Sequence, residues 1–298
     1  MQNLKVLIVG ATGFIGQKVA EYAVDEGWEV TVGVRNLKKA EKLFRDLPVS
    51  MMKIDLTTDN WDLKDFNTVF NLAALLPKKT KDIEGMVKVN SLGVYKLIKK
   101  CRNAGVERVI HSSSMAVYGS PEYLPVDEKH PKNPRTYYGI SKLTGELFFT
   151  NDEWSGVERV ILRYSTVYGP GMDKEEVIPL LIKKMLRCES VKVVANNTAD
   201  FVCVEDVAEA NILAAKAAFD EEVVDFNIGS GKETSIKELA GIIRKLTNSS
   251  SEITEIHSQN PKRFYFNIDK ARNYLGYNPK VPLEVGIRNC IESLQNRG

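Results

Sequence analysis

Short apolar runs rich in β-branched residues alternate with longer amphipathic stretches through the first 165 residues. The short runs predict strands at Lys5–Val9, Glu29–Val34, Ser50–Ile54, Thr68–Leu72, Arg108–His111 and Arg159–Leu162. The longer stretches predict helices at Phe14–Asp25, Leu37–Asp46, Glu84–Asn103 and Tyr137–Thr150. Nearly continuous apolar strands separated by helices are typical of a parallel sheet that is covered on both faces. The pattern therefore predicts a doubly wound α/β fold.

The pattern changes after about residue 165, where Gly169-Pro170-Gly171 interrupts it. Further strands are predicted at Val191–Ala195, Asp200–Val204 and Asp225–Gly229, and the last of these is a candidate for one more strand of the sheet. Helices are predicted at Val177–Arg187, Glu205–Phe219, Ser235–Thr247, Asp269–Leu275 and Glu284–Asn296. We expect residues 166–298 to form mainly a smaller, helix-rich lobe, with segments near 200–230 returning to the sheet.

Composition and charge exclude several classes of protein. The 298 residues carry a net charge of only +2, which gives no electrostatic case for a nucleic-acid or membrane partner. Four cysteines without CxxC spacing and only three histidines predict neither a disulfide framework nor a bound metal. The chain begins with a strand rather than a signal segment, and no apolar run approaches the roughly 18 residues that span a bilayer. We therefore expect a cytoplasmic protein.

Three glycines follow the first predicted strand at a spacing that suits phosphate binding. Gly10 permits a tight turn, Gly13 lets backbone N–H groups approach a pyrophosphate, and Gly16 lets the next helix pack closely on the strand. The start of that helix then faces the anion. The motif predicts that residues 1–165 are a Rossmann-type dinucleotide-binding domain, and that residues 166–298 mainly bind substrate. The predicted cradle consists of Gly10, Thr12, Gly13, Phe14, Ile15 and Gly16.

The end of the second predicted strand bears on the choice of cofactor. An acidic residue at this place would hydrogen-bond a ribose 2′-hydroxyl and repel a 2′-phosphate. The sequence instead has Val34 followed by Arg35, with Lys38 and Lys39 close behind. Because a guanidinium matches the geometry of a phosphate, Arg35 favours NADP, with NAD as the second choice. The alternative is that Arg35 stacks on the adenine or faces solvent.

Tyr-x-x-x-Lys occurs twice, as Tyr95/Lys99 and Tyr138/Lys142, and the position of each pair decides between them. The fifth predicted strand ends in three serines, of which Ser114 is the last, and the next helix begins near Tyr138. Ligands of an open parallel sheet bind beyond the carboxyl ends of its strands, so a serine hydroxyl and this pair can converge there. Tyr95 precedes the serines and is expected to pack against the sheet. We therefore predict Ser114, Tyr138 and Lys142 as the catalytic residues.

These three residue types suit hydride chemistry at a secondary alcohol. Removal of hydride from such an alcohol requires removal of the hydroxyl proton in the same event. A tyrosine, with an ordinary pKa of about 10, becomes an effective base when nearby positive charge stabilises its phenolate. Lys142 and an oxidised nicotinamide can both supply that charge, so Tyr138 is expected to be the general base, or the general acid in the reductive direction. Ser114 would hydrogen-bond the reacting oxygen.

Motifs through nearly the whole chain resemble the extended short-chain dehydrogenase/reductase family, in its NAD(P)-dependent epimerase/dehydratase branch. Besides the glycines and the Ser–Tyr–Lys set, they are Asp55-Leu56, Asn71-Leu72-Ala73-Ala74, Asn90 with Gly93, Ser112–Gly119, Leu162-Arg163-Tyr164, Val167–Gly171, Asp200-Phe201-Val202 and Asn227–Gly231. The resemblance implies that Asn90 supports the active site from its helix. It also implies a homodimer packed through helices 84–103 and 137–150. The further cofactor contacts it implies are Asp55 and Leu56 at the adenine, Ala73 and Ala74 at the diphosphate and ribose, and Tyr164 with the backbone after it at the nicotinamide.

Two departures from the family pattern bear on the substrate. Thr166 stands where sugar-nucleotide members typically carry Asn, and Ala199 stands where they commonly carry an Arg that clamps a diphosphate. Arg263, or its neighbour Lys262, could supply a phosphate contact instead, or both could be solvated surface. The candidate substrate-binding residues are Ser114, Thr166 and Arg263.

Three other segments have a smaller bearing on function. Met115-Ala116 replaces the acidic pair with which the family's 4,6-dehydratases eliminate water, which argues against dehydration. Lys78–Lys81 is either a contact to cofactor or substrate phosphate or a solvated loop, and the solvated loop is favoured. His111 continues an apolar strand and is expected to be a satisfied core histidine.

The sequence thus predicts an NAD(P)-dependent enzyme that acts on a secondary alcohol or ketone, with a nucleotide sugar as the leading substrate. An epimerase, in which a keto intermediate turns and is reduced on its other face, is slightly favoured. One alternative is an NADPH-dependent reductase of a small carbonyl compound. Another is an NADP-sensing protein without turnover, although such proteins usually lose the tyrosine or the lysine that this chain retains.

Overall fold

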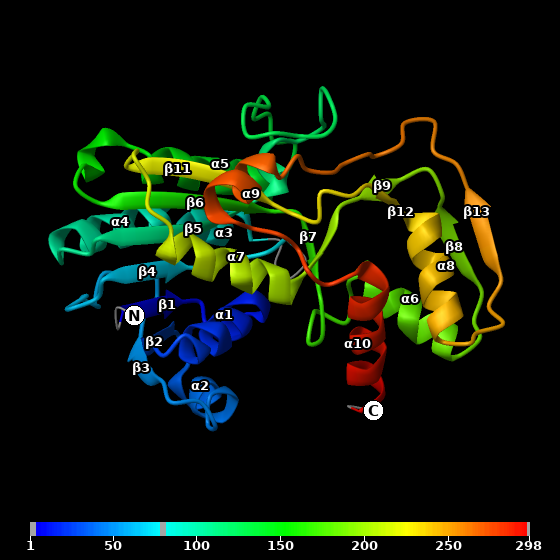
Figure 1. The fold of residues 1–298 in the computed structure, drawn as a ribbon, viewed down its shortest axis with the longest axis horizontal. Coiled ribbons are helices and arrows are strands. Elements are labelled where there is room, and N and C mark those ends of the chain that lie inside the picture. Colours follow the sequence, from blue (N-terminus) through cyan, green and yellow to red (C-terminus); the bar gives the residue numbers. More distant parts are fainter. Residues whose placement is uncertain (1–3, 78–81, 297–298) are drawn as a thin grey trace.

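The computed structural model describes residues 4–77 and 82–296, and it consists of a large α/β body beside a smaller lobe (Figure 1). Seven strands form one parallel sheet in the order β11-β6-β5-β4-β1-β2-β3. They are β1 (Lys5–Val9), β2 (Glu29–Val34), β3 (Ser50–Lys53), β4 (Thr68–Asn71), β5 (Arg108–Ser114), β6 (Glu158–Tyr164) and β11 (Val223–Ile228). This sheet confirms the predicted doubly wound, Rossmann-type fold.

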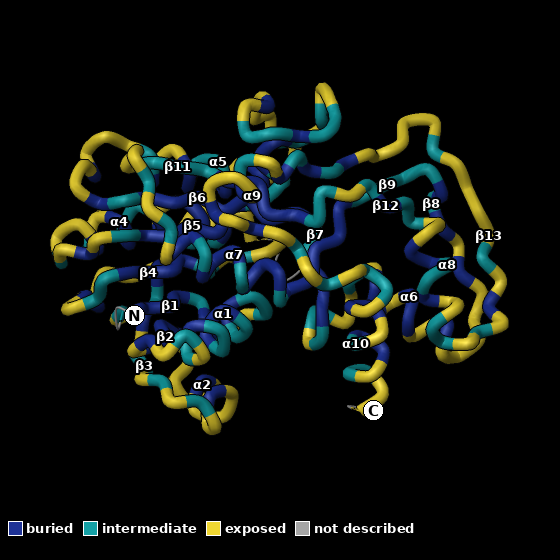
Figure 2. Tube along the Cα trace, in the orientation of Figure 1, coloured by how far each residue is buried: buried dark blue, intermediate teal, exposed yellow. Residues whose placement is uncertain are grey.

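Helices cover both faces of the sheet, because successive residues of a strand point to opposite faces. In β1, Val6 and Ile8 join one apolar core, whereas Leu7 and Val9 join another. The first core lies under α1 (Phe14–Asp25), α2 (Leu37–Leu43) and α7 (Val204–Lys216), and the second lies under α4 (Gly93–Asn103) and α5 (Tyr137–Phe149). Figure 2 shows the strands as the buried centre of this arrangement.

The helix predicted at 84–103 consists of three pieces. It begins as α3 (Ile83–Val87), continues as the π-helical segment η1 (Lys88–Leu92), and ends as α4. Asn90 lies in the middle of η1 and is fully buried. Single π-helical turns inside α-helices occur frequently at functional sites. The strand predicted from Arg108 runs through the three serines and ends at Ser114, as β5, in agreement with the sequence.

The smaller lobe contains more strand than the sequence predicted. Its helices are α6 (Val177–Leu186), α8 (Ile236–Leu246) and α10 (Leu283–Gln295). They are joined by three two-stranded pairs, formed by β7 (Thr166–Tyr168) with β10 (Phe201–Cys203), β8 (Val191–Val194) with β13 (Ile253–Ile256), and β9 (Thr198–Ala199) with β12 (Thr234–Ser235). Beside the sheet, α9 (Asp269–Leu275) packs on β11 and α7. The division of the chain near residue 165 stays a prediction.

Three features of the structure bear on what the composition predicts: membrane-spanning helices, metal ligands and disulfide bonds. Within the described ranges, no helix is both long and apolar enough to cross a membrane. The same residues contain no group of three or more His, Cys, Asp or Glu side chains that is placed to hold a metal ion. Cys101, Cys188, Cys203 and Cys290 are all free thiols.

Candidate active site

A cavity of about 240 Å³, which we call the cofactor cavity, lies at the carboxyl ends of β1 to β4. Ligands of open parallel sheets bind at this edge. Eight of its lining residues are predicted cofactor contacts, namely Gly10, Thr12, Gly13, Arg35, Asp55, Leu56, Ala73 and Ala74. Leu75 and Val89 also line it, and no sequence motif had pointed to either of them.

The glycines at the head of the cofactor cavity leave no room for side chains. Gly10 has a φ of +84°, and a Cβ on it would lie 2.6 Å from the Ala73 backbone nitrogen. A Cβ on Gly16 would lie 2.5 Å from the carbonyl oxygen of Gly10. Gly13 caps α1 without a side-chain hydrogen bond, so the first N–H groups of the helix can face a bound anion. The residues present therefore fit the diphosphate of a dinucleotide.

Phe14, Ile15, Gly16 and Tyr164 are predicted cofactor contacts that do not line the cavity. Ile15 packs against the apolar core, and the Phe14 ring lies 3.5 Å from the position of a Cβ built on Gly169. The Tyr164 side chain is buried and donates a hydrogen bond of 3.0 Å to Asn211 of α7. Its ring therefore points away from the cofactor cavity, and a contact with the nicotinamide would have to come from its backbone.

Positive charge gathers at the end of β2. Arg35 and Lys39 both line the cofactor cavity. Across from them, Asp55 accepts hydrogen bonds from the backbone and the hydroxyl of Thr57 at 2.9 and 2.7 Å. Although desolvation opposes the shift, these hydrogen bonds and the charge of Arg35 lower the pKa of Asp55. The cavity therefore offers cations where an adenosine phosphate would be placed.

Ser114, Tyr138 and Lys142 meet at the end of β5. Thr136 accepts a hydrogen bond of 3.0 Å from the backbone of Gly139, which starts α5 one residue before Tyr138. The Ser114 hydroxyl lies close enough to that of Tyr138 to lower the pKa of Tyr138. The Lys142 ammonium donates to the carbonyl oxygen of Ser112, two residues before Ser114. The structure thus brings together the three residues that the sequence predicted as catalytic.

Burial changes the acid–base chemistry of the Tyr–Lys pair. Desolvation raises the pKa of Tyr138 to about 12, although the hydrogen bond with Ser114 acts in the opposite direction. Desolvation also lowers the pKa of Lys142 to about 8, against the attraction of the Glu146 carboxylate. In the cofactor-free protein the pair therefore disfavours the phenolate. Additional positive charge beside Tyr138 would favour it.

Asn90 joins the cofactor cavity to the helix that carries Tyr138. Its side chain accepts a hydrogen bond of 2.8 Å from the Leu75 N–H and donates one of 3.0 Å to the Leu75 carbonyl. It also donates to the Ser141 hydroxyl at 3.0 Å. Leu75 lines the cavity, and Ser141 lies on α5 between Tyr138 and Lys142. This geometry agrees with the supporting role that the family resemblance implies for Asn90.

The remaining candidate substrate residues lie on the lobe side of this centre. Thr166 is half-buried on β7, and its hydroxyl is 3.8 Å from the sulfur of Met115. Arg263 is exposed and makes two hydrogen bonds of 2.7 and 2.8 Å with the Glu233 carboxylate. A substrate phosphate would have to compete with Glu233 for this guanidinium. The substrate contacts of Thr166 and Arg263 stay predictions.

The other residues considered from the sequence lie away from the catalytic group. Tyr95 packs against Phe148, with its ring centroid 5.8 Å from that of the phenylalanine. His111 is buried as expected, but only its Nδ1 has a partner, the Asn71 amide at 3.2 Å. Among the described residues its Nε2 has none, so the expectation of a fully satisfied histidine is wrong. Residues 78–81, the candidate phosphate contact or solvated loop, lie outside the described residues.

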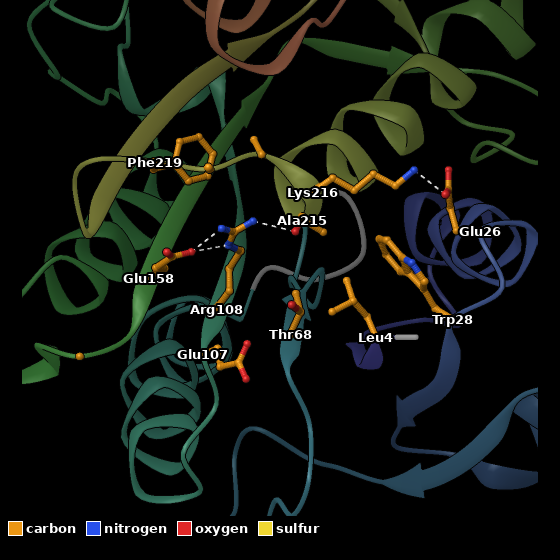
Figure 3. Close-up of a pocket in the computed structure, with 13 residues that line it drawn as sticks. Leu4, Glu26, Trp28, Thr68, Glu107, Arg108, Glu158, Ala215, Lys216 and Phe219 are labelled. Atoms are coloured by element: carbon orange, nitrogen blue, oxygen red, sulfur yellow. Dashed lines mark hydrogen bonds and ion pairs between the residues drawn. The ribbon is translucent and has the colours of Figure 1, made fainter. Parts of the chain in front are cut away.

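A larger cavity of about 880 Å³ opens at the opposite edge of the sheet, where the strands begin (Figure 3). Two cations that line it are already paired. Arg108 contacts Glu158, and Lys216 contacts Glu26. Because ligands of open parallel sheets bind at the carboxyl ends of the strands, the cofactor cavity remains the candidate site.

The parallel sheet, the glycine cradle and the Ser–Tyr–Lys group define a dinucleotide-dependent enzyme that works on a hydroxyl or carbonyl group. A model of the NAD dependent epimerase/dehydratase family matches residues 6–229. A putative UDP-glucose 4-epimerase from Methanocaldococcus jannaschii is 34% identical over 307 residues, which cover 98% of each chain. The chain belongs to the NAD-dependent epimerase/dehydratase family.

Solved structures agree with this membership. A UDP-N-acetylglucosamine 4-epimerase from Methanobrevibacter ruminantium superposes with a TM-score of 0.88 at 27% identity, covering 100% of both chains. A UDP-glucuronic acid 4-epimerase from Bacillus cereus, in complex with UDP-glucuronic acid and NAD, gives a TM-score of 0.85 at 25% identity. That match covers 99% of this chain and 100% of the other. The protein is thus an NAD(P)-dependent enzyme of the epimerase type, acting on a secondary alcohol or ketone.

Proposed function

We propose that the protein is a nucleotide-sugar 4-epimerase in which Ser114, Tyr138 and Lys142 are the catalytic residues. The observation that carries the proposal is the convergence of these three side chains at the strand edge that also holds the cofactor cavity. The similarity to proteins named as UDP-sugar 4-epimerases supports the substrate class and the position of the reacting carbon. It favours this function over reduction of a small carbonyl compound.

The residues of the site have different roles in such a reaction. The glycine cradle and the cofactor cavity would hold a nicotinamide dinucleotide, which supplies a reversible hydride acceptor. Tyr138 removes the proton from the sugar hydroxyl while Ser114 hydrogen-bonds the same oxygen. Lys142 stabilises the tyrosine phenolate by its charge. The keto sugar then turns in the site and would regain the hydride on its other face, while Tyr138 returns the proton to the oxygen, so the reaction has no net oxidation.

The test is conversion of UDP-glucose, UDP-N-acetylglucosamine or UDP-glucuronic acid into its C4 epimer, followed by chromatography. We expect an equilibrium mixture with cofactor present in catalytic amount only. Tyr138→Phe should abolish turnover while cofactor binding persists, because only the hydroxyl is removed. Stoichiometric consumption of NADPH with a simple ketone would instead support the reductase. Full activity of Tyr138→Phe would contradict the assignment of the general base.

We further propose that the cofactor is NADP in preference to NAD. Arg35 and Lys39 line the cofactor cavity at the end of β2, where a 2′-phosphate would be recognised. Related structures in complex with NAD support a nicotinamide dinucleotide in general. Calorimetric titration should show tighter binding of NADP, and Arg35→Asp should reverse the order. Lys38→Ala, at a neighbour outside the cavity lining, is the control and should leave both affinities unchanged. Equal affinities for NADP and NAD in the unmodified protein would exclude a phosphate role for Arg35.

The homodimer implied by the family resemblance also stays a proposal. The outer surfaces of η1 and α5 expose apolar side chains, including Leu92, Ile140 and Leu147, the last with 64% of its surface accessible. Burial of such a patch favours association. Sedimentation should give a dimer that Leu147→Glu converts into a monomer, whereas Tyr274→Glu on α9 should leave it intact. A monomeric wild-type protein would exclude this assembly. The cytoplasmic location expected from the sequence stays a prediction.

A further inference from the structure

Glu146 is a nearly inaccessible carboxylate directly behind the catalytic residues. It lies on α5 one helical turn after Lys142, and only 3% of its side chain is exposed. The carboxylate accepts two hydrogen bonds of 2.9 Å from Arg163, through Nε and Nη2, and one from the Ser113 hydroxyl. A buried charge costs free energy unless it is paired in this way. Glu146 has no place in the mechanism described so far.

The Ser113 contact links the two elements that carry the catalytic side chains. Ser113 immediately precedes Ser114 on β5, whereas Tyr138 and Lys142 lie on α5. The hydrogen bond from Ser113 to Glu146 therefore holds the end of the strand against the helix. Charge-assisted hydrogen bonds are shorter and stronger than neutral ones, so this contact restricts how far Ser114 can move relative to Tyr138.

Glu146 also supplies the negative charge that acts on Lys142. Only 1% of the Lys142 residue is exposed, so its ammonium has lost most of its hydration. The titratable groups near it are His111 on β5 and, on α5, Tyr138 one turn before it and Glu146 one turn after it. Of these, Glu146 raises the pKa of Lys142 and partly offsets desolvation. Arg163 and Lys132 also lie near the Glu146 carboxylate, at 2.9 and 3.9 Å. Their positive charges do not cancel its effect on the pKa of Lys142.

We propose that Glu146 is a positioning residue of the reaction, which keeps Lys142 charged and holds Ser114 in register with Tyr138. The inference rests on the proposed function, because it assigns Glu146 a part in the work of that same site. It distinguishes Glu146 from Asp225, the other carboxylate of Arg163. Asp225 contacts Arg163 at 2.6 Å and Lys270 at 2.8 Å, and neither contact involves Ser113.

The experiment compares Glu146→Gln with Asp225→Asn. Each variant removes one negative charge from Arg163 and keeps the size of the side chain, but only the first faces Lys142 and Ser113. The protein is labelled with ¹³Cε-lysine, and the Lys142 signal, assigned with Lys142→Met, is titrated by NMR without cofactor. We expect Glu146→Gln to shift the Lys142 titration at least one pH unit lower, and Asp225→Asn to leave it in place.

Turnover gives the second readout. Glu146→Gln should lower kcat at least tenfold at neutral pH and move the alkaline limb of the pH profile to lower pH, because Lys142 loses its proton earlier. Asp225→Asn should change kcat less than twofold. Ser113→Ala should lower kcat without moving the Lys142 titration, and Glu146→Asp should retain that titration because it keeps the charge. These last two variants test the two halves of the proposal even if Glu146→Gln fails to fold.

Two outcomes would overturn the inference. One is an unchanged Lys142 titration in Glu146→Gln, and the other is an equal loss of kcat in Glu146→Gln and Asp225→Asn. If Glu146→Gln does not fold, wild-type kcat in Ser113→Ala would overturn it. A wild-type protein that binds cofactor but converts no nucleotide sugar would instead contradict the proposed function. The lysine titration is measured without substrate, so the two failures remain distinguishable.

Discussion

The Asn90 side chain donates a hydrogen bond to the Ser141 hydroxyl, which in turn donates to the Tyr138 carbonyl at 2.8 Å. Asn90 also satisfies both backbone groups of Leu75, at the wall of the cofactor cavity. The π-helical turn is therefore the place where the cofactor and catalytic parts of the site are coupled. This coupling has a measurable consequence for stability and for binding.

Asn90→Ala should lower the free energy of unfolding by roughly 1–3 kcal/mol, because it leaves the backbone groups of Leu75 without their partners. It should also weaken dinucleotide binding and lower kcat, since Leu75 and Tyr138 both lose a fixed neighbour. Urea denaturation and calorimetric titration measure the two effects. Ser91→Ala is the control, because the Ser91 hydroxyl donates to the Ser141 carbonyl and, among the described residues, no hydrogen bond joins its side chain to Leu75. Equal losses of cofactor affinity in the two variants would refute the link through Leu75.

Gly16→Ala should weaken dinucleotide binding by at least tenfold. The new Cβ would lie 2.5 Å from the Gly10 carbonyl oxygen, which is backbone and can yield only if the whole turn moves. The matched change is Gly241→Ala on α8, where a Cβ meets nothing within 4 Å. That change should raise the free energy of unfolding by about 0.5–1 kcal/mol and leave binding unaltered. Unchanged affinity in Gly16→Ala would show that the turn does not form the cofactor site.

Local patterns were enough to predict most of the sheet and its helices. The bounds of β1 and α1 agree with the sequence, because a short continuous apolar run and a glycine turn are signals carried within a few residues. The convergence of Ser114, Tyr138 and Lys142 could be predicted in the same way, because the Tyr–Lys spacing and the serines mark two elements whose ends meet in a parallel sheet. Their catalytic role stays a prediction. In the lobe, β8 and β10 were predicted, but β7, β9, β12 and β13 were not, since two residues such as Thr198–Ala199 are too few to show a period.

Features made by distant residues could not be read from the sequence. The π-helical turn at Asn90 is stabilised by partners 15 and 51 positions away, Leu75 and Ser141. The ion pair of Arg263 with Glu233, 30 positions away, could not be predicted from the sequence either. It competes with a phosphate for the Arg263 guanidinium. The hydrogen bond from the Tyr164 hydroxyl to Asn211 of α7, 47 positions away, is also made by distant residues, and the contact of Tyr164 and the backbone after it with the nicotinamide stays a prediction.

Arg263→Ala should raise the KM for a nucleotide sugar about tenfold and leave kcat nearly unchanged, if the guanidinium binds a substrate phosphate. An interaction made equally with substrate and transition state affects KM alone, and a charged hydrogen bond contributes roughly 1.5–3 kcal/mol. Glu233→Gln should have the opposite effect, because it weakens the ion pair that competes for Arg263. Arg272→Ala, at another exposed arginine with an ion pair to Asp269, is the control. An unchanged KM in Arg263→Ala would remove this residue from the substrate site.

Lys142→Met should stabilise the cofactor-free protein at neutral pH while it abolishes turnover. Burial lowers the pKa of Lys142 from 10.5 to about 8, so between these values the unfolded chain binds more protons than the folded one. The free energy of unfolding of the wild type therefore rises with pH across this window. Below pH 8 the buried ammonium costs the folded state roughly 2–3 kcal/mol, a cost that methionine does not carry.

At pH 7 the free energy of unfolding of Lys142→Met should exceed that of the wild type by about 2 kcal/mol, because loss of the hydrogen bond to Ser112 offsets part of the stabilisation. This difference should shrink steadily as the pH rises from 8 to 10.5, because above pH 10.5 the wild-type lysine is neutral in both states. Urea denaturation at pH 7 and pH 10 measures the difference, and Lys38→Met, at an exposed lysine, gives the effect of the replacement alone. If Lys142→Met were less stable than the wild type at pH 7, Lys142 would have to be stabilised as an ammonium by more than Glu146. The low pKa assigned to Lys142 would then be wrong.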